Sequence, residues 1–141
     1  MKKVIVFGTF DLVHKGHLSF FRQAKRLGDC LMAVVARDKF VKGAKGKFPT
    51  NNEKSRLRNV RKLDLVDKAI LGSRTHNFFR TIRTHKADII ALGHDQKPPV
   101  KNLKRDLRRH RLGNIKIVRL KPYKANQYKT SKLTVNKERL K

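Results

Sequence analysis

Two histidines separated by two residues form the most chemically informative segment of the chain. They lie in residues 8–17, which follow an apolar run and are rich in small and polar residues: Gly8-Thr9-Phe10-Asp11-Leu12-Val13-His14-Lys15-Gly16-His17. Gly8 and Gly16 allow the backbone to approach a ligand closely, and His17 is expected at the start of a helix, where free N–H groups favour anions. Both imidazoles can then face a phosphate, and each is expected to become cationic at modest cost because its pKa lies near neutrality. The segment predicts a phosphate site; turn histidines, or a partial metal site with Asp11, are the alternatives.

The elements that must position this segment alternate between apolar runs of strand length and helical patterns. Strands are expected at residues 4–7, 31–36, 68–71, 89–92 and 115–120, and helices at residues 17–27, 52–61, 77–84 and 101–110. Residues 39–51 contain glycines, lysines and a proline and indicate a mobile loop, and a last helix is expected from about residue 131. The alternation predicts an α/β fold, a Rossmann-like three-layer sandwich in which a five-stranded parallel sheet carries helices on both faces. We expect one domain over residues 1–141, with residues 130–141 as a terminal helix or tail.

Ligands bind to such a sheet at the carboxyl ends of its strands, where the strand order reverses. Residues 8–17 follow the first expected strand, residues 37–47 the second and residues 93–96 the fourth. Asp95 there could simply cap a turn, but its place at the binding edge favours a role in ligand binding.

The composition narrows the classes of protein. Thirty-seven Lys and Arg against ten Asp and Glu give a net charge of +27, which suits either a nucleic-acid binder or a phosphate-handling enzyme. No apolar run reaches 18 residues, so no membrane span is expected, and the polar residues after the first strand make a signal peptide unexpected. Cys30 is the only cysteine, which excludes a disulfide framework or multi-cysteine zinc site within one chain and favours the cytoplasm.

The first motif resembles a known family. Gly-Thr-Phe-Asp followed by His-x-Gly-His, with a helix that ends in Leu27-Gly28-Asp29, is similar to the cytidylyltransferase-like nucleotidyltransferases. The resemblance runs from Lys3 to about Leu133, and is nearest to archaeal-type FAD synthetases (FMN adenylyltransferases) and next to glycerol-3-phosphate cytidylyltransferases. Gly93-His94-Asp95-Gln96 resembles the Gly-x-Asp-Gln of the FAD synthetases, and Tyr128 to Leu133 resembles the family's Ile-Ser-Thr-Thr-Lys-Ile, although Lys129 replaces the usual first serine.

The resemblance implies roles for particular residues. His14, His17 and a loop lysine, taken as Lys45 with Lys42 and Lys47 left open, would neutralise the phosphates during catalysis. The remaining nucleotide-binding residues implied are Gly8, Thr9, Phe10, Asp11, Gly16, Lys42, Arg56, Gly93, Asp95, Gln96, Thr130 and Ser131. No metal-ligating set is expected in the protein, since Mg²⁺ is usually held by the triphosphate and water, although Asp11 is a candidate for a contact.

The implied reaction is displacement at the α-phosphorus of a nucleoside triphosphate by the phosphate oxygen of an acceptor, with release of pyrophosphate. ATP and FMN are the favoured substrates, with CTP and glycerol 3-phosphate as the alternative. An apolar wall for the flavin ring could come from Phe48, Phe78, Phe79 or Tyr123. A non-catalytic, basic nucleic-acid-binding module is the alternative of a different class. The family also suggests a homodimer, and the charge suggests nonspecific binding of polyanions.

Overall fold

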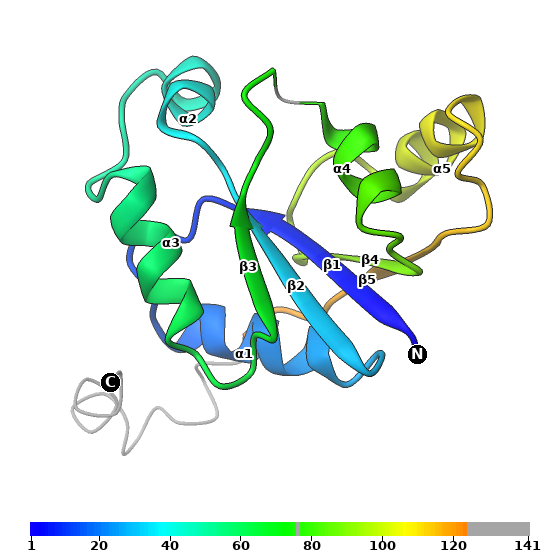
Figure 1. The fold of residues 1–141 in the computed structure, drawn as a ribbon, viewed down its shortest axis with the longest axis horizontal. Helices are drawn as coiled ribbons and strands as arrows, with labels where there is room; N and C mark the ends of the chain where they lie inside the picture. Colours follow the sequence, from blue (N-terminus) through cyan, green and yellow to red (C-terminus); the bar gives the residue numbers. More distant parts are fainter. Residues whose placement is uncertain (76, 124–141) are drawn as a thin grey trace.

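The protein is built on a five-stranded parallel sheet with the strand order β3-β2-β1-β4-β5 (Figure 1). The computed structural model describes residues 1–75 and 77–123. Its strands are β1 (Lys3–Gly8), β2 (Cys30–Val35), β3 (Lys68–Leu71), β4 (Ile89–Leu92) and β5 (Lys116–Arg119). They confirm the strands predicted from the apolar runs, with small differences at their ends.

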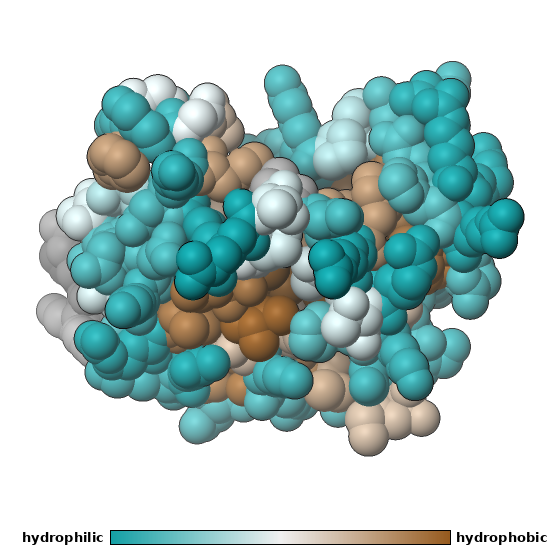
Figure 2. Space-filling view, turned by 45° about the horizontal axis from the view of Figure 1, so that its top comes forward, coloured by the Kyte–Doolittle hydropathy of each residue, from teal (hydrophilic) through white to brown (hydrophobic). Residues whose placement is uncertain are grey.

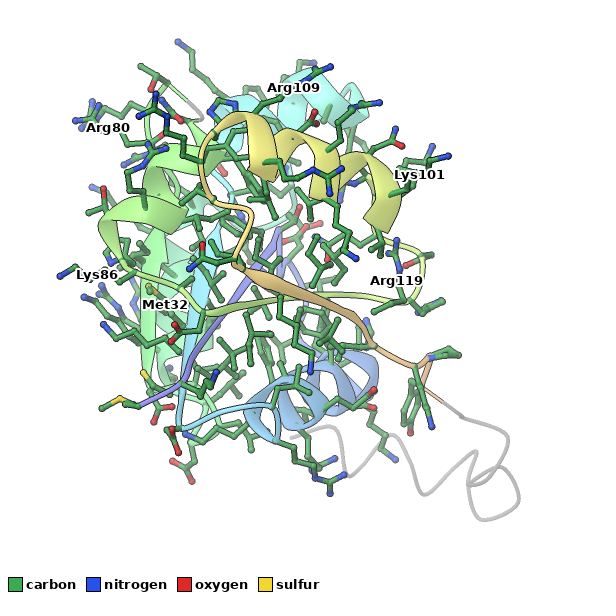
Figure 3. The ribbon with its side chains drawn as sticks, turned by 90° about the vertical axis from the view of Figure 1, so that its right-hand side faces the viewer. Met32, Arg80, Lys86, Lys101, Arg109 and Arg119 are labelled. Atoms are coloured by element: carbon green, nitrogen blue, oxygen red, sulfur yellow. The ribbon has the colours of Figure 1, made fainter. Side chains whose placement is uncertain are left out.

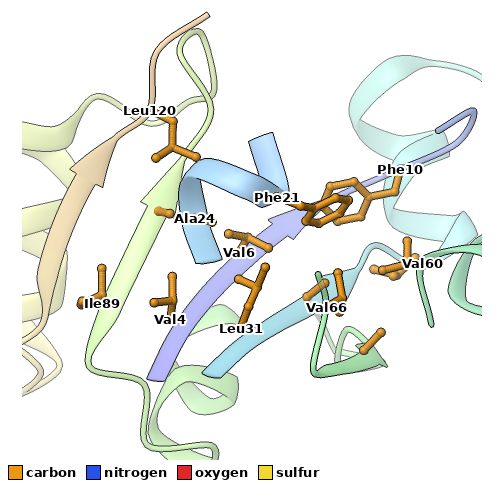
Figure 4. Packing of buried hydrophobic residues seen from close by; sticks show 14 residues of the cluster. Val4, Val6, Phe10, Phe21, Ala24, Leu31, Val60, Val66, Ile89 and Leu120 are labelled. Atoms are coloured by element: carbon orange, nitrogen blue, oxygen red, sulfur yellow. The ribbon is translucent and has the colours of Figure 1, made fainter. Parts of the chain in front are cut away.

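Helices cover both faces of the sheet because side chains alternate in direction along each strand. Val4 and Val6 of β1 pack with α1 (Lys15–Lys25) and α3 (Glu53–Arg61). Ile5 between them belongs to the opposite core, which includes side chains of α4 (Phe78–Thr84) and α5 (Val100–Arg109). Figure 4 shows the first of these cores, in which Phe21 and Ala24 of α1 lie over β1. The three-layer arrangement predicted from the alternating pattern is therefore confirmed.

The strand order reverses at β1, which pairs with β2 on one side and β4 on the other. Gly8 lies opposite Val35 at the carboxyl end of β1, and Leu92 lies opposite Arg119 at the carboxyl end of β4. The segments that follow β1 and β4 thus leave the sheet side by side. This is the edge at which a ligand site is expected in an open parallel sheet.

One prediction was wrong: part of the expected loop is the helix α2 (Asp38–Lys45). Glu53 holds its start, since Asp38 N–H donates to Glu53 Oε1 at 2.8 Å and Glu53 N–H donates to Asp38 Oδ2 at 3.2 Å. Gly46 ends the helix with a φ of 83°, a conformation that glycine adopts without strain. The glycines that suggested a loop therefore lie inside this helix or at its end. The helix expected from residue 131 lies outside the described residues.

Candidate active site

His14 and His17 are held by backbone hydrogen bonds at the start of α1. Gly16 N–H donates to Nδ1 of His14 at 3.0 Å, and His14 N–H donates to Nδ1 of His17 at 3.3 Å. Each Nδ1 is therefore an acceptor, so the ring proton of each neutral imidazole resides on Nε2. The ring centroids lie 4.2 Å apart. The two rings thus lie together at one helix start, where the sequence predicts a phosphate site.

Gly16 is needed for this geometry. A Cβ at this position would lie 2.9 Å from Cε1 of His14, closer than real Cβ atoms come to such an atom. Any larger residue would push the His14 ring away from the Gly16 N–H. The glycine of the motif makes room for an imidazole, whereas the sequence suggested that it makes room for the ligand.

His17 does not have the protonation behaviour expected from the sequence. Burial, together with the neighbouring His14, lowers the pKa of His17 to about 4, while a backbone hydrogen bond with Leu12 acts in the opposite direction. His17 is therefore neutral at physiological pH in the protein without substrate, and the expectation that both rings are easily protonated is wrong for it. An anionic phosphate beside the ring would raise this pKa again.

Phe10 shapes the loop between β1 and α1. Its backbone has a φ of 51°, and its buried ring folds back so that a Cβ on Gly8 would lie 2.6 Å from it. The ring packs against Phe21 at 5.0 Å between centroids (Figure 4). It also meets His17 edge-on at 5.9 Å. Phe10 thus anchors the loop in the core, next to Thr9, which lines the cleft described below.

Asp11 joins the same loop to the segment between α2 and α3. Its carboxylate accepts hydrogen bonds from the N–H groups of Thr50 at 2.7 Å and Asn51 at 2.8 Å. Burial acts to raise the pKa of Asp11, but these bonds and the charge of Arg56 together bring the pKa below its usual value. Both carboxylate oxygens of Asp11 thus accept backbone hydrogen bonds, although this residue also lines the cleft described below.

Arg56 is completely buried, with an exposed fraction of 0%. Its guanidinium donates to the carbonyl oxygen of Thr9 at 2.8 Å, to that of Asn51 at 3.0 Å and to Oδ1 of Asp38 at 2.6 Å. The arginine that the resemblance assigned to the nucleotide therefore fastens the Thr9 loop to the start of α2. Within the described residues, Arg56 lines neither of the two cavities of the site, which are described below.

Lys45 is the loop lysine that reaches the site. Its Nζ donates to Oγ1 of Thr9 at 3.3 Å, and it lines the same cleft as the histidines. Lys42 instead donates to the carbonyl oxygen of Gly46 at 3.0 Å, with its ammonium over the ring of Phe48. The structure thus places Lys45, the lysine taken as catalytic, at the cleft and Lys42 outside its lining.

The histidine cleft, with a volume of about 890 Å³, brings most of the predicted residues together. Among them are Gly8, Thr9, Phe10, Asp11, His14, Gly16, His17, Lys45, Gly93, Asp95 and Gln96. Lys42 and Arg56 lie outside its lining, and Thr130 and Ser131 lie outside the described residues. Segments from the ends of β1 and β4 and from α2 therefore converge on one cleft.

Lys121 and Tyr123 also line this cleft, from the chain beyond β5. Gln23 of α1 fixes that segment, because its Nε2 donates to the Lys121 carbonyl at 2.9 Å and its Oε1 accepts from Lys121 N–H at 2.8 Å. No motif in the sequence includes Lys121. Its position just after a strand was the available signal, since ligand sites gather at strand ends.

Gln96 forms a wall between the histidine cleft and a second cavity. Its Oε1 accepts from Gly93 N–H at 3.0 Å, and its Nε2 donates to the Phe7 carbonyl at 2.8 Å. Both ends of the amide are therefore engaged with the backbone. This residue serves to join the ends of β1 and β4.

The second cavity, the aromatic pocket, has a volume of about 440 Å³ and shares part of its lining with the histidine cleft. Phe78 and Phe79 of α4 line it, as two of the proposed wall residues should, whereas Phe48 and Tyr123 do not. The lining common to both cavities consists of Phe7, Gly8, Thr9 and Gln96. Volumes of about 300–1,000 Å³ are typical of small-molecule sites.

Two further properties concern metal ions and membranes. Within residues 1–75 and 77–123, no three His, Cys, Asp or Glu side chains gather as a metal-binding group. None of the helices in this part of the chain is long and apolar enough to cross a membrane.

Comparison with known proteins finds archaeal FAD synthases that resemble this chain over most of its length. The FAD synthase of Archaeoglobus profundus is 45% identical over 131 residues, which cover 93% of this chain and 82% of the relative. That of Archaeoglobus fulgidus is 46% identical over 114 residues, covering 81% of this chain and 80% of the relative.

Solved structures agree with the fold. A lipopolysaccharide core biosynthesis protein from Thermoplasma volcanium superimposes with a TM-score of 0.82 at 39% identity, covering 87% of this chain and 98% of that chain. The family model described as cytidylyltransferase-like matches residues 5–135, so this chain belongs to the cytidylyltransferase-like family.

Proposed function

We propose that the protein is an FMN adenylyltransferase, which joins the adenylyl group of ATP to the phosphate of FMN and releases pyrophosphate. The observation that carries the proposal is the shared wall of Phe7, Gly8, Thr9 and Gln96 between the histidine cleft and the aromatic pocket. A triphosphate at the histidines would then lie next to an acceptor in the pocket. The archaeal FAD synthases that resemble this chain support the same choice of substrates.

The aromatic pocket suits a planar ring. Phe7 and Phe78 contact each other with centroids 4.4 Å apart, and Phe79 meets Phe78 edge-on at 5.2 Å. Aromatic side chains of this kind offer a large apolar area and preferred stacking geometries to a flat ligand. Glycerol 3-phosphate has no apolar group that would use them. The pocket therefore favours a flavin as the acceptor.

The reaction needs positioning and charge stabilisation more than an activated nucleophile, because the attacking phosphate oxygen is already anionic. The FMN phosphate oxygen forms a bond to the α-phosphorus of ATP. The bond between that phosphorus and the oxygen that bridges it to the β-phosphate breaks, and its electron pair leaves with pyrophosphate. His14 and His17 would donate hydrogen bonds from Nε2 to the phosphates, and Lys45 would neutralise charge near Thr9. Mg²⁺ would enter with the triphosphate, since both Asp11 oxygens already accept backbone hydrogen bonds.

The test is release of pyrophosphate by the purified protein with Mg²⁺, with ATP and CTP each paired with FMN and with glycerol 3-phosphate. We expect release only with ATP and FMN, and its loss in His17→Ala. His85→Ala is the matched control, because His85 lies at the end of α4 and lines neither cavity. Release with CTP alone would overturn the choice of substrates and keep nucleotidyl transfer. No release with any pair would favour the basic binding module.

A homodimer, suggested by the family resemblance, and a cytoplasmic location, suggested by the single cysteine, stay predictions. Light scattering of the purified protein measures the first, with twice the mass of the chain as the expected result.

A further inference from the structure

The segment that joins β4 to α5, residues 93–98, contributes to both cavities. Residues 93–95 line the histidine cleft, and Lys97 and Pro98 line the aromatic pocket. Gln96 lies between them and lines both. The position of this one segment therefore affects the shape of the two cavities together.

Arg119, the last residue of β5, holds this segment (Figure 3). Its Nη1 donates to the carbonyl oxygen of Gly93 at 2.9 Å and also to that of Gln96. Its Nη2 donates to the carbonyl oxygen of Pro98 at 3.5 Å. One guanidinium thus contacts the beginning, the middle and the end of the segment.

Gln96 fastens the segment from within. Its side chain spans from the Gly93 N–H to the Phe7 carbonyl, which ties the segment to the end of β1. Arg119 ties the same segment to the end of β5. The two side chains together connect it to the strands on either side of β4 in the sheet.

We infer that Arg119 is a positioning residue that sets the geometry of both substrate sites by clamping residues 93–98. The inference rests on the proposed function for the identity of the substrates. Arg119 lines neither the histidine cleft nor the aromatic pocket as far as the described residues form them. It acts on the substrates through the backbone that it holds.

The chemistry of the side chain gives the inference a specific test. A guanidinium offers five N–H donors in a rigid plane, whereas a lysine ammonium is a compact charge on a flexible stem. Arg119→Lys keeps the charge but cannot span three carbonyl oxygens. If the clamp is correct, Arg119→Lys should behave like Arg119→Ala.

The kinetic experiment measures KM and kcat for ATP and for FMN in both variants. Losing hydrogen bonds from a charged group should raise KM for both substrates about tenfold, while kcat changes less than about threefold. Arg61→Ala is the control, because Arg61 also donates to a backbone carbonyl oxygen, that of Ala69 at 3.1 Å, but lines neither cavity. Its KM values should stay at those of the wild type. Wild-type KM values in Arg119→Lys, or a rise for one substrate only, would overturn the clamp.

Hydrogen exchange tests the clamp without relying on turnover. Mass spectrometry of the unliganded protein should show faster exchange of the amides in residues 93–97 in both Arg119 variants and unchanged exchange there in Arg61→Ala. Unchanged exchange in the Arg119 variants overturns the inference. If the wild type makes no FAD, the proposed function fails, and the exchange measurement still decides whether Arg119 holds the segment.

Discussion

Lys45 donates a hydrogen bond from Nζ to Oγ1 of Thr9 at 3.3 Å, and so connects the end of α2 to the loop that follows β1. Thr9 lies in the wall shared by the two cavities, where the acceptor and the triphosphate would meet. The position of the Lys45 ammonium depends on α2, a helix that the sequence did not predict. The position of α2 in turn depends on the buried Arg56.

Removing the Lys45 charge should impair catalysis more than removing either neighbouring lysine. Lys45→Met is expected to lower kcat/KM for ATP by roughly 10²-fold, a loss typical for one group that stabilises transition-state charge. Lys42→Met and Lys47→Met should lose less, and Lys39→Met on the same helix should match the wild type. Steady-state pyrophosphate release measures all four, and an equal loss in Lys42→Met would contradict the assignment.

Gly16→Ala should lower activity by at least about tenfold, because the new Cβ would displace the His14 ring from its hydrogen bond. Gly43→Ala provides the matched substitution, since a Cβ there meets nothing within 4 Å and Gly43 lies within α2. We expect Gly43→Ala to stabilise the protein by about 1 kcal/mol and to leave activity unchanged. Urea unfolding and turnover of both variants test this. Full activity in Gly16→Ala would show that the His14 geometry is dispensable.

The low pKa of His17 predicts a loss of stability in mild acid. Its pKa is about 4 in the folded protein and near 6.5 when unfolded, so between these values the unfolded chain binds a proton that the folded chain does not. Stability should therefore fall as the pH drops from about 6.5 to about 4. The effect should be about 1–2 kcal/mol, because solvent reaches part of the ring and screens it.

The measurement compares urea unfolding of the wild type and of His17→Gln at several pH values. The wild type should lose more stability than His17→Gln over this interval, since glutamine does not titrate. Parallel curves for the two proteins would rule out the depressed pKa.

Arg56→Met should destabilise the protein by about 3 kcal/mol, because it leaves Asp38 and the Thr9 and Asn51 carbonyls without their buried partner. Arg58→Met on the exposed side of α3 should change stability by less than about 0.5 kcal/mol. Unfolding midpoints in urea measure both. Similar midpoints for the two variants would refute a structural role for Arg56.

The basic surface predicts a weak, salt-sensitive affinity for polyanions. Most of the face in Figure 2 is hydrophilic, with apolar residues gathered near its middle. Exposed cations such as Arg80, Lys101 and Arg109 extend from α4 and α5 (Figure 3). Binding of single-stranded RNA should fall steeply between about 50 and 200 mM salt, whereas turnover should change little. RNA binding that survives this increase in salt would point to specific recognition.

The sequence was sufficient for features that depend on local pattern. The apolar runs predicted each strand of the sheet, and the pattern of residues 17–27 predicted a helix that begins at the histidine motif. Features that depend on contacts between distant residues were not predictable. Asp11 bonds to Thr50 and Asn51, and nothing near Asp11 in the sequence indicates that these N–H groups use its carboxylate.

The same limit applies to α2 and to the aromatic residues proposed to contact the flavin ring. Glycines and lysines are common in loops, and only the reciprocal hydrogen bonds of Asp38 and Glu53 explain why a helix begins there. Phe48 and Phe79 are both aromatic residues near glycines or turns, but only Phe79 faces a cavity. Choosing between them requires knowing which helices lie on each side of the sheet.

The common wall of the two cavities has a consequence for protein engineering. A substitution at Phe7, Gly8, Thr9 or Gln96 reaches both cavities, so it would change the acceptor and the nucleotide preference together. Phe78, Phe79 and Leu103 line only the aromatic pocket. Libraries that seek a new acceptor should therefore vary these three positions first and leave the wall untouched.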